Sequence, residues 1–160
     1  MKILIIYDSV FGNTEQIARV MGDYLAGKTV VKKVNEVMPE DLKDLNLLLV
    51  GSPTRGFKPT EGIMTFLKGL PAGSLKGLSA AAFDTRIPLD SINNAILRNL
   101  VKMGGYADKI IAKQLKQKGA TLLPSAGFLV SASEGPLVVG EVKRAVDWIK
   151  ELVSLVSITP

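Results

Sequence analysis

The stretch YDSVFGNTEQIA, residues 7–18, places Ser9, Gly12, Asn13 and Thr14 between an apolar run and a helical pattern. Unpaired backbone N–H groups at the start of a helix attract anions, and hydroxyl and amide side chains add further hydrogen-bond donors. Glycine lets the backbone approach a bound group closely. The loop can therefore hold a phosphate, or it can simply cap the helix, for which Ser, Asn and Thr are equally suited. It lacks the Gly-Lys-Ser/Thr ending of a Walker loop and the Gly-x-Gly-x-x-Gly of the dinucleotide fingerprint.

Two further loops with polar residues follow apolar runs. They are GSPTRGFKPTEG at 51–62 and FDTRIPLD at 83–90. In a doubly wound sheet, ligands bind outside the carboxyl ends of the parallel strands, where the strand order reverses. We therefore expect the three loops to meet at one end of the sheet and to form the functional site together.

The chain contains neither Cys nor His. This composition removes disulfides, thiolate chemistry, the commonest general base near neutral pH and the commonest metal ligand. We predict no metal site and no catalytic side chain, so any chemistry comes from carboxylates, lysines, hydroxyls, backbone groups or a bound cofactor. The cytoplasm is the compartment expected of such a chain.

The charge balance is basic, with 20 Lys and Arg against 15 Asp and Glu, a net charge of +5. Such a balance favours nucleic acid, anionic lipid or acidic protein partners. Lysines crowd the region 102–118, which we interpret as a solvated helix face because no nucleic-acid motif accompanies it. We expect no nucleic-acid partner, and an acidic protein partner stays open. Apolar runs are too short for a membrane span, and the N-terminal run is followed by no signal-peptide cleavage site.

Apolar runs alternate with helical patterns along the whole chain. Strands are expected at 2–7, 28–37, 45–51, 78–84 and 120–132, and helices at 17–25, 63–70, 92–102, 106–118 and 139–156. Near-continuous apolar strands such as KILIIY are typical of a parallel sheet that is buried on both faces. The alternation predicts an α/β fold with a doubly wound parallel sheet, formed by one domain over residues 1–160.

Several single residues carry local predictions. The pair Gly104–Gly105 breaks the third helical region, 92–118, into two helices. Pro124 and Gly127 indicate that the last strand lies at an edge or contains a bulge, because proline cannot donate to a strand ladder. Trp148 lies at helical spacing with apolar residues and is expected in the core. Glu134 precedes the last helix and is expected in a capping or turn role.

The first loop resembles the phosphate loop of flavodoxins, whose usual pattern is Ser/Thr-x-Thr-Gly-Asn-Thr. Ser9, Gly12, Asn13 and Thr14 match this pattern, Val10 occupies its variable position, and Phe11 stands where a threonine is usual. DLKDLNLLLVGSPT resembles the third strand and flavin loop of that family, and AAFDT resembles its fourth strand and third loop. GEVKRAVDWIKEL is similar to its closing helix, and the length suits the short-chain form.

The resemblance implies a three-layer fold with five parallel strands in the order 2-1-3-4-5. It also implies non-covalent FMN, with the phosphate in the first loop and the ring between the second and third loops. The protein would then carry electrons between redox partner proteins, with the flavin supplying the chemistry. The cofactor-binding residues implied are Ser9, Val10, Phe11, Gly12, Asn13, Thr14, Ser52, Pro53, Thr54, Arg55, Gly56, Phe57, Phe83, Asp84, Thr85 and Arg86.

The sequence departs from the flavodoxin pattern at the two positions that usually stack aromatics on the ring. These positions carry Arg55 and Ile87, although Phe57 could supply one aromatic face. Gly56 could allow a peptide to reorient toward the ring. Together with Lys58 and Arg86, Arg55 makes the rim basic, which should stabilise the fully reduced flavin anion and make the second reduction potential less negative. Plain solubilising charge is the alternative.

Two acidic residues near the loops have other expected roles. Asp8 should turn away from a phosphate, because like charges repel, or interact with a helix end. Asp84 should either hydrogen-bond the flavin or ribityl chain, or cap the following segment.

Three alternative functions remain open on the sequence. GSPTRGF also resembles the Pro-Thr-Arg-Phe segment of flavodoxin-like NAD(P)H:quinone reductases of the tryptophan-repressor-binding-protein type. A flavodoxin-like protoporphyrinogen oxidase, which is membrane-associated, is a second relative. The third alternative is a flavodoxin fold that has lost its flavin and serves as a binding module, which the missing aromatics favour.

Overall fold

Strands and helices alternate along the chain in the computed structural model, which describes residues 1–27 and 29–158. The strands are β1 (Ile3–Tyr7), β2 (Thr29–Lys33), β3 (Leu47–Pro53), β4 (Ser79–Arg86), β5 (Thr121–Leu122) and β6 (Ala126–Leu129). The α-helices are α1 (Asn13–Leu25), α2 (Glu61–Gly69), α3 (Ala95–Gly104), α4 (Ala107–Gln117) and α5 (Glu141–Ile158). Short 3₁₀ helices are η1 (Val34–Glu36), η2 (Pro39–Leu42) and η3 (Leu89–Ser91).

The sheet is parallel and its strands lie in the order β2-β1-β3-β4-β5, which confirms the predicted order. The predicted fifth strand is divided. β5 and β6 both pair with β4, and the residues between them include Pro124, which has no N–H to donate to a ladder. This division places the segment at the edge of the sheet, as Pro124 predicted.

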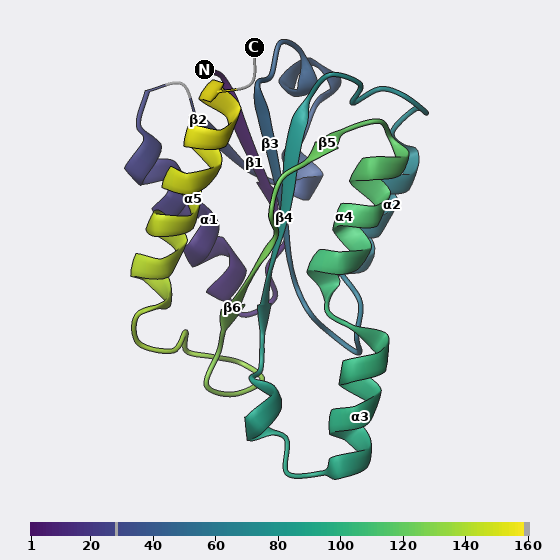
Figure 1. Ribbon diagram of the computed structural model, residues 1–160, viewed down its shortest axis with the longest axis vertical. Helices are drawn as coiled ribbons and strands as arrows, with labels where there is room; N and C mark the ends of the chain where they lie inside the picture. Colours follow the sequence, from purple (N-terminus) through teal and green to yellow (C-terminus); the bar gives the residue numbers. More distant parts are fainter. Residues whose placement is uncertain (28, 159–160) are drawn as a thin grey trace.

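Helices cover both faces of the sheet, so the molecule has three layers (Figure 1). α1 and α5 lie on one face, and α2 and α4 lie on the other. Along β1, Ile3, Ile5 and Tyr7 join the core on the first face, whereas Leu4 and Ile6 join the core on the second. Because side chains alternate across a strand, a continuous apolar run supplies both cores.

Apart from the divided fifth strand, the predicted boundaries lie within two residues of the observed ones except at the second strand and at the starts of α1 and α3, which begin at Asn13 and Ala95 instead of 17 and 92. The second strand ends at Lys33, and the residues 34–36 that were expected to extend it form η1. Its predicted first residue, Lys28, lies outside the described residues. The helix break is confirmed, since α3 ends at Gly104 and Gly105 follows with φ +74°. Only a residue that tolerates positive φ suits this position.

Helix α5 closes the α1 face of the sheet. It begins two residues after the predicted start at 139, and it buries Ala145, Ile149 and Leu152. Trp148 lies in the same core, as predicted, and packs edge-on against Phe83 at a centroid distance of 6.1 Å. No helix within residues 1–27 or 29–158 combines the length and apolarity that a membrane crossing needs.

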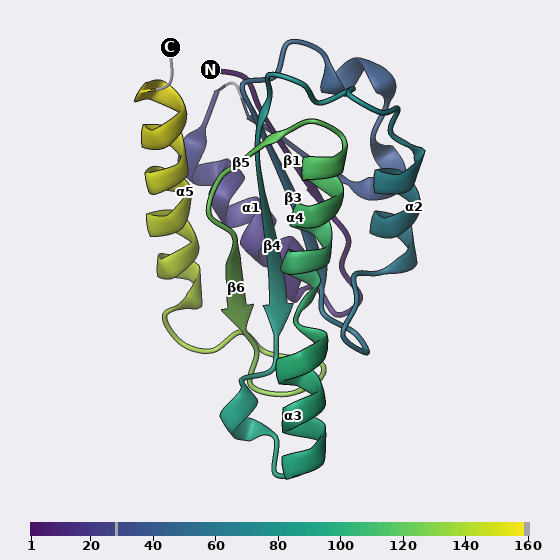
Figure 2. The same ribbon diagram turned by 45° about the vertical axis from the view of Figure 1, so that its right-hand side comes forward.

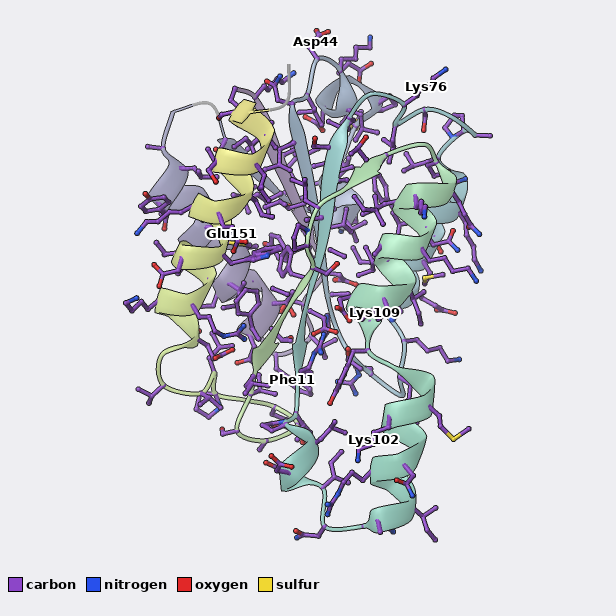
Figure 3. The ribbon with its side chains drawn as sticks, in the orientation of Figure 1. Phe11, Asp44, Lys76, Lys102, Lys109 and Glu151 are labelled. Carbon is purple, nitrogen blue, oxygen red and sulfur yellow. The ribbon has the colours of Figure 1, made fainter. Side chains whose placement is uncertain are left out.

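Helix α3 projects beyond the carboxyl ends of the strands, as both ribbon views show (Figures 1 and 2). It belongs to the connection 87–106 between β4 and α4, which is far longer than the roughly 2–6 residues usual between a strand and its helix. Figure 3 shows Phe11 and Lys102 toward this end of the molecule and Asp44 and Lys76 at the opposite end. The long connection therefore adds residues beside the expected site.

Candidate functional site

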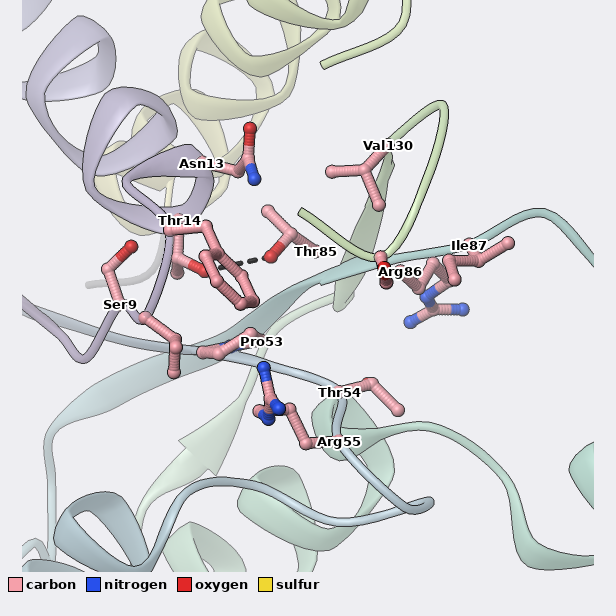
Figure 4. Close-up of a pocket in the computed structure, with 13 residues that line it drawn as sticks. Ser9, Asn13, Thr14, Pro53, Thr54, Arg55, Thr85, Arg86, Ile87 and Val130 are labelled. Atoms are coloured by element: carbon pink, nitrogen blue, oxygen red, sulfur yellow. Dashed lines mark hydrogen bonds between the residues drawn. The ribbon is translucent and has the colours of Figure 1, made fainter. Parts of the chain in front are cut away.

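The three predicted loops meet at the carboxyl ends of β1, β3 and β4 and enclose a cavity of about 90 Å³ (Figure 4). This end of the sheet is the switch point, because β1 lies between β2 and β3. We call this cavity of about 90 Å³ the polar cavity. It is lined by Ser9, Val10, Phe11, Asn13, Thr14, Pro53, Thr54, Arg55, Thr85, Arg86, Ile87, Val130 and Ser133.

The start of α1 is open to a ligand. Gly12 occupies the N-cap position with φ +90°, so no side chain caps the helix. The Gly12 N–H donates to Ser9 Oγ (3.1 Å), while the N–H groups of residues 10, 11 and 13–15 have no acceptor within the described chain. A helix start with free N–H groups attracts an anion. The geometry therefore differs from the simple capping that Ser, Asn and Thr also allowed.

Basic side chains line the polar cavity. Arg55 and Arg86 are among its lining residues, and none of these residues is acidic. The nearest acid in sequence, Asp8, accepts the Ser9 N–H (2.9 Å), and its other oxygen lies beside Gly62 in the first turn of α2. Asp8 thus turns away from the cavity, as predicted.

Hydrogen bonds between distant segments fix the walls of the polar cavity. Thr14 Oγ1 lies 2.8 Å from Thr85 Oγ1, which ties α1 to the end of β4 (Figure 4). The Asn13 amide donates to the Glu134 carbonyl (3.0 Å), so the loop after β6 closes over the start of α1. Glu134 lies in a turn, as predicted. The sequence reasoning missed Val130 and Ser133, because nothing local marks them as neighbours of the first loop.

The second loop ends in a tight turn. Arg55 and Lys58 exchange both backbone hydrogen bonds (3.0 and 3.1 Å), and the two residues between them, Gly56 and Phe57, have φ +52° and +67°. Positive φ at both central positions is the mark of a type I′ turn. Glycine accepts this conformation readily, whereas for phenylalanine it costs on the order of 1–2 kcal/mol. The structure around Phe57 must stabilise the side chain where it lies.

Arg55 reaches from the second loop across to the first. Its guanidinium carbon lies 5.4 Å from the centre of the Phe11 ring, within the range of a cation–π contact. In Figure 4 the guanidinium points toward the segment that precedes α1. Both side chains are exposed, and this contact spans the mouth of the polar cavity. The positions of Arg55 and Phe11 are therefore linked across the two loops.

A buried ionic network lies behind the cavity. Arg86 Nε donates to Asp84 Oδ1 at 2.6 Å, and Arg86 Nη2 lies 2.9 Å from Asp108 Oδ1 at an angle that gives an ion pair without a hydrogen bond. The Arg86 guanidinium also lies 3.8 Å from the centre of the Tyr106 ring. The prediction that Arg86 adds free positive charge to the rim is therefore wrong, because two carboxylates neutralise it.

Asp84 caps α4 from another element. Its Oδ2 accepts from Thr54 Oγ1 (2.8 Å) and from the Asp108 N–H (3.2 Å), while Thr54 Oγ1 accepts from the Ala107 N–H (2.9 Å). The free N–H groups at the start of α4 are thus satisfied by β3 and β4. Of the two predicted roles for Asp84, these contacts match capping, although Asp84 caps α4, 24 residues along the chain, and not the segment that directly follows it.

Burial perturbs the acid–base behaviour of this network. Asp84 is completely buried, and desolvation raises its pKa above the ordinary value, although Arg86 opposes that shift. Desolvation also raises the pKa of Tyr106, again against the effect of Arg86. A buried charge with a partner and hydrogen bonds is tolerated, whereas the same charge alone is strongly unfavourable. Arg86 therefore compensates the charge of the buried Asp84, and without Arg86 that charge would destabilise the folded protein.

Six of the sixteen residues implied by the resemblance do not line the polar cavity, namely Gly12, Ser52, Gly56, Phe57, Phe83 and Asp84. Three of these six are fully buried. Phe83 is buried in the core against Phe128 and Trp148, and Asp84 belongs to the network described above. Ser52 is also buried, and its Oγ accepts from the Thr60 N–H (2.9 Å), which closes the base of the second loop. These side chains support the loops and have no direct access to a ligand in the polar cavity.

A second cavity lies beside the first, with a volume of about 340 Å³. We call it the apolar cavity. It is lined by Thr54, Gly56, Phe57, Arg86, Ile87, Ile92 and Tyr106. Ile92 and Tyr106 come from the long connection that carries α3, and the sequence reasoning assigned neither of them to the site.

The polar cavity lies at the switch point of a doubly wound parallel sheet, which is where α/β proteins of this class bind their ligands. Comparison with solved structures defines the fold within this class. A flavodoxin from the domain Archaea is 20% identical, with a TM-score of 0.77 over 98% of this chain and 99% of that one. Oxidised flavodoxin 2 from Bacillus cereus is 20% identical, with a TM-score of 0.74 over 97% and 99%.

A flavodoxin, WrbA-like protein from Agrobacterium tumefaciens shares 12% identity, with a TM-score of 0.69 over 98% of this chain and 97% of that one. No protein-family model matches the sequence, and the search of curated proteins found no match. The chain therefore has the flavodoxin-like fold, as predicted, and its ligand must be argued from its own residues.

Proposed function

We propose that this protein binds FMN non-covalently and carries electrons between redox partner proteins. The observation that carries the proposal is the polar cavity, which has the size and the lining suited to a phosphate. The flavodoxins among the structural neighbours support the same proposal, although at 20% identity they establish only the fold.

The residues present fit the phosphate of FMN. The free N–H groups of residues 10, 11 and 13–15 are available as donors. Ser9 Oγ accepts from the Gly12 N–H through a lone pair, so its own O–H is still available to donate. At Gly12 a Cβ would meet no atom within 4 Å, so the space before α1 is open. Thr14 and Thr85 add hydroxyls on the far wall. A dianion placed here gains donors and meets no acidic side chain among the lining residues.

In this proposal the flavin supplies the electron transfer, and the protein supplies binding and electrostatics. Arg55 is the positive side chain at the cavity mouth that has no carboxylate partner within the described chain. It favours negative charge on a bound ligand by Coulomb attraction. The less negative second reduction potential expected from the sequence therefore rests on Arg55 and Lys58, without Arg86.

The partner proteins should carry acidic surfaces. Arg55 and Lys58 lie on the second loop, and exposed Lys102 and Lys109 lie on α3 and near the start of α4 (Figure 3). Positive charge around the end of the molecule that holds the cavity steers an acidic partner to the site.

The test is the visible absorption spectrum of purified protein, before and after incubation with FMN and removal of the excess. We expect a flavin band close to an equimolar ratio. Riboflavin, which lacks the phosphate, is the matched ligand and should be retained far less. Protein that retains neither ligand would contradict the proposal and favour the flavin-free binding module. Bleaching of the band by NAD(P)H without a partner would assign reductase activity instead of electron carriage.

A further inference from the structure

The two cavities differ in what they can contain. Small-molecule clefts usually measure about 300–1,000 Å³. The polar cavity, at about 90 Å³, is below this range and suits a phosphate, whereas the apolar cavity, at about 340 Å³, lies within it. A ligand with a phosphate and a large ring system therefore needs a second compartment for the ring.

The apolar cavity and the polar cavity share part of their walls. Thr54, Arg86 and Ile87 line both. A ligand whose phosphate lies at the start of α1 thus reaches the apolar cavity by passing these three residues. The Arg86 guanidinium is held by Asp84 and Asp108, so this shared wall is fixed in position.

The chemistry of the apolar cavity suits a flat aromatic group. Phe57 lies on the second loop and Tyr106 precedes α4, so aromatic side chains reach the cavity from two elements, and Ile87 and Ile92 add aliphatic walls. Phe57 is half-buried there although its φ of +67° is unfavourable for its type. The strained backbone at Phe57 directs its ring into the apolar cavity, and a smaller residue at this position would leave that space empty.

We infer that the apolar cavity holds the isoalloxazine ring of FMN, with Phe57 and Tyr106 as its aromatic contacts. This inference rests on the proposed function. It assigns the aromatic contacts of the ring to Phe57 and Tyr106 and not to positions 55 and 87, where the flavodoxin pattern would place them. It also gives the connection 87–106 a direct part in ligand binding.

The test measures the dissociation constant of FMN and the fluorescence of the bound flavin, because a tyrosine in contact with the ring quenches its emission by electron transfer. The variants are Phe57→Asn and Tyr106→Leu, and Tyr24→Leu is the matched control. Tyr24 lies on α1, where Lys150 covers its ring at 5.0 Å, outside both cavities. We expect each cavity variant to raise the dissociation constant about tenfold, and we expect Tyr106→Leu also to brighten the bound flavin.

Phe57→Asn also separates binding from folding. Asparagine tolerates positive φ, so the flavin-free variant should unfold at the same or a higher temperature than the unmodified protein while binding FMN more weakly. Unchanged affinity in both cavity variants, together with unchanged quenching in Tyr106→Leu, would overturn the inference while leaving the proposed function intact. Failure of the unmodified protein to retain FMN would overturn both.

Discussion

At the scale of single residues, the site depends on which basic side chains are paired with carboxylates and which are not. Arg55 and Arg86 both line the polar cavity, yet only Arg86 is neutralised, by Asp84 and Asp108. Arg55 contacts the Phe11 ring and keeps its charge available to a ligand. The two arginines therefore have different roles: Arg86 holds β4 against α4, and Arg55 makes the electrostatic potential at the cavity mouth positive.

Replacing the buried acid, Asp84→Asn, should change how stability depends on pH. The pKa of Asp84 is raised in the folded protein above its ordinary value of 3.8, mainly by burial. Between these two pKa values the folded state binds more protons than the unfolded state, so a rise in pH reduces the contribution of Asp84 to stability. We expect the free energy of unfolding of the unmodified protein, minus that of the variant, to fall as pH rises from about 4, by at most about 1.4 kcal/mol per pH unit.

Urea unfolding of both proteins at a series of pH values between 4 and 7 measures this difference. Titration of the carboxylates outside the Arg86 network cancels in the subtraction. A difference that grows with pH would show that the ion pair with Arg86 outweighs burial and that the pKa of Asp84 is lowered.

At the scale of elements, the end of β4, the start of α4 and β6 are held together through Arg86. Its guanidinium lies between the Tyr106 ring and the backbone of β6 at Gly127, where a Cβ would overlap it. The glycine in β6 thus makes room for a side chain of the neighbouring strand. The position of α4, and with it one wall of the apolar cavity, depends on this small space.

Adding a methyl group there, Gly127→Ala, should displace the flexible end of Arg86 and leave Asp84 buried without its cation. We expect a loss of about 3 kcal/mol in the free energy of unfolding, because breaking a buried ion pair leaves an uncompensated charge. Gly69→Ala is the matched control, since a Cβ at the end of α2 meets no atom within 4 Å and the φ is not positive. The same change there should be neutral or slightly stabilising.

Equal effects of the two substitutions in urea unfolding would contradict the role given to Gly127. A stable Gly127→Ala protein whose Arg86 keeps its contacts in a crystal structure would do so as well.

The sequence predicted the elements well because their causes are local. Apolar runs marked the strands, and Gly104–Gly105 marked the break before α4, which the positive φ of Gly105 explains. The network around Arg86 was not predictable in this way. A lone arginine after a strand is usually an exposed charge, and only the tertiary structure brings Asp108 and Tyr106 beside it.

The candidate site was predictable only in part, for the same reason. The first loop could be assigned to the candidate site from Ser9, Gly12 and Thr14, because these residues form a local pattern directly after a strand. Ser133 and Tyr106 reach the cavities from segments far along the chain, and no local pattern links them to the first loop. Gly127 was interpreted as the sign of an edge or a bulge, whereas its contact with Arg86 is a long-range effect.

At the scale of the whole molecule, the net charge of +5 should act on ligand association. A positive protein attracts an anion over distances comparable to the Debye length, about 10 Å at 0.1 M salt. We expect the association rate of FMN to fall severalfold when ionic strength rises from 0.01 to 0.5 M, and that of uncharged riboflavin to change little. Stopped-flow mixing of flavin-free protein with each ligand measures the rates, and an equal salt dependence for both would count against electrostatic attraction.

The two edges of the sheet also determine how copies of the chain meet in concentrated solution. An open strand edge can accept a strand from a neighbouring molecule and start aggregation. Here one edge is the five-residue β2, whose Lys32 is paired with Asp41 of η2 at 2.7 Å, and the other is divided between the short β5 and β6 around Pro124. Neither edge offers a long, flat, uncharged strand. Intermolecular sheet extension, the first step toward fibrils, is therefore disfavoured on both sides of the molecule.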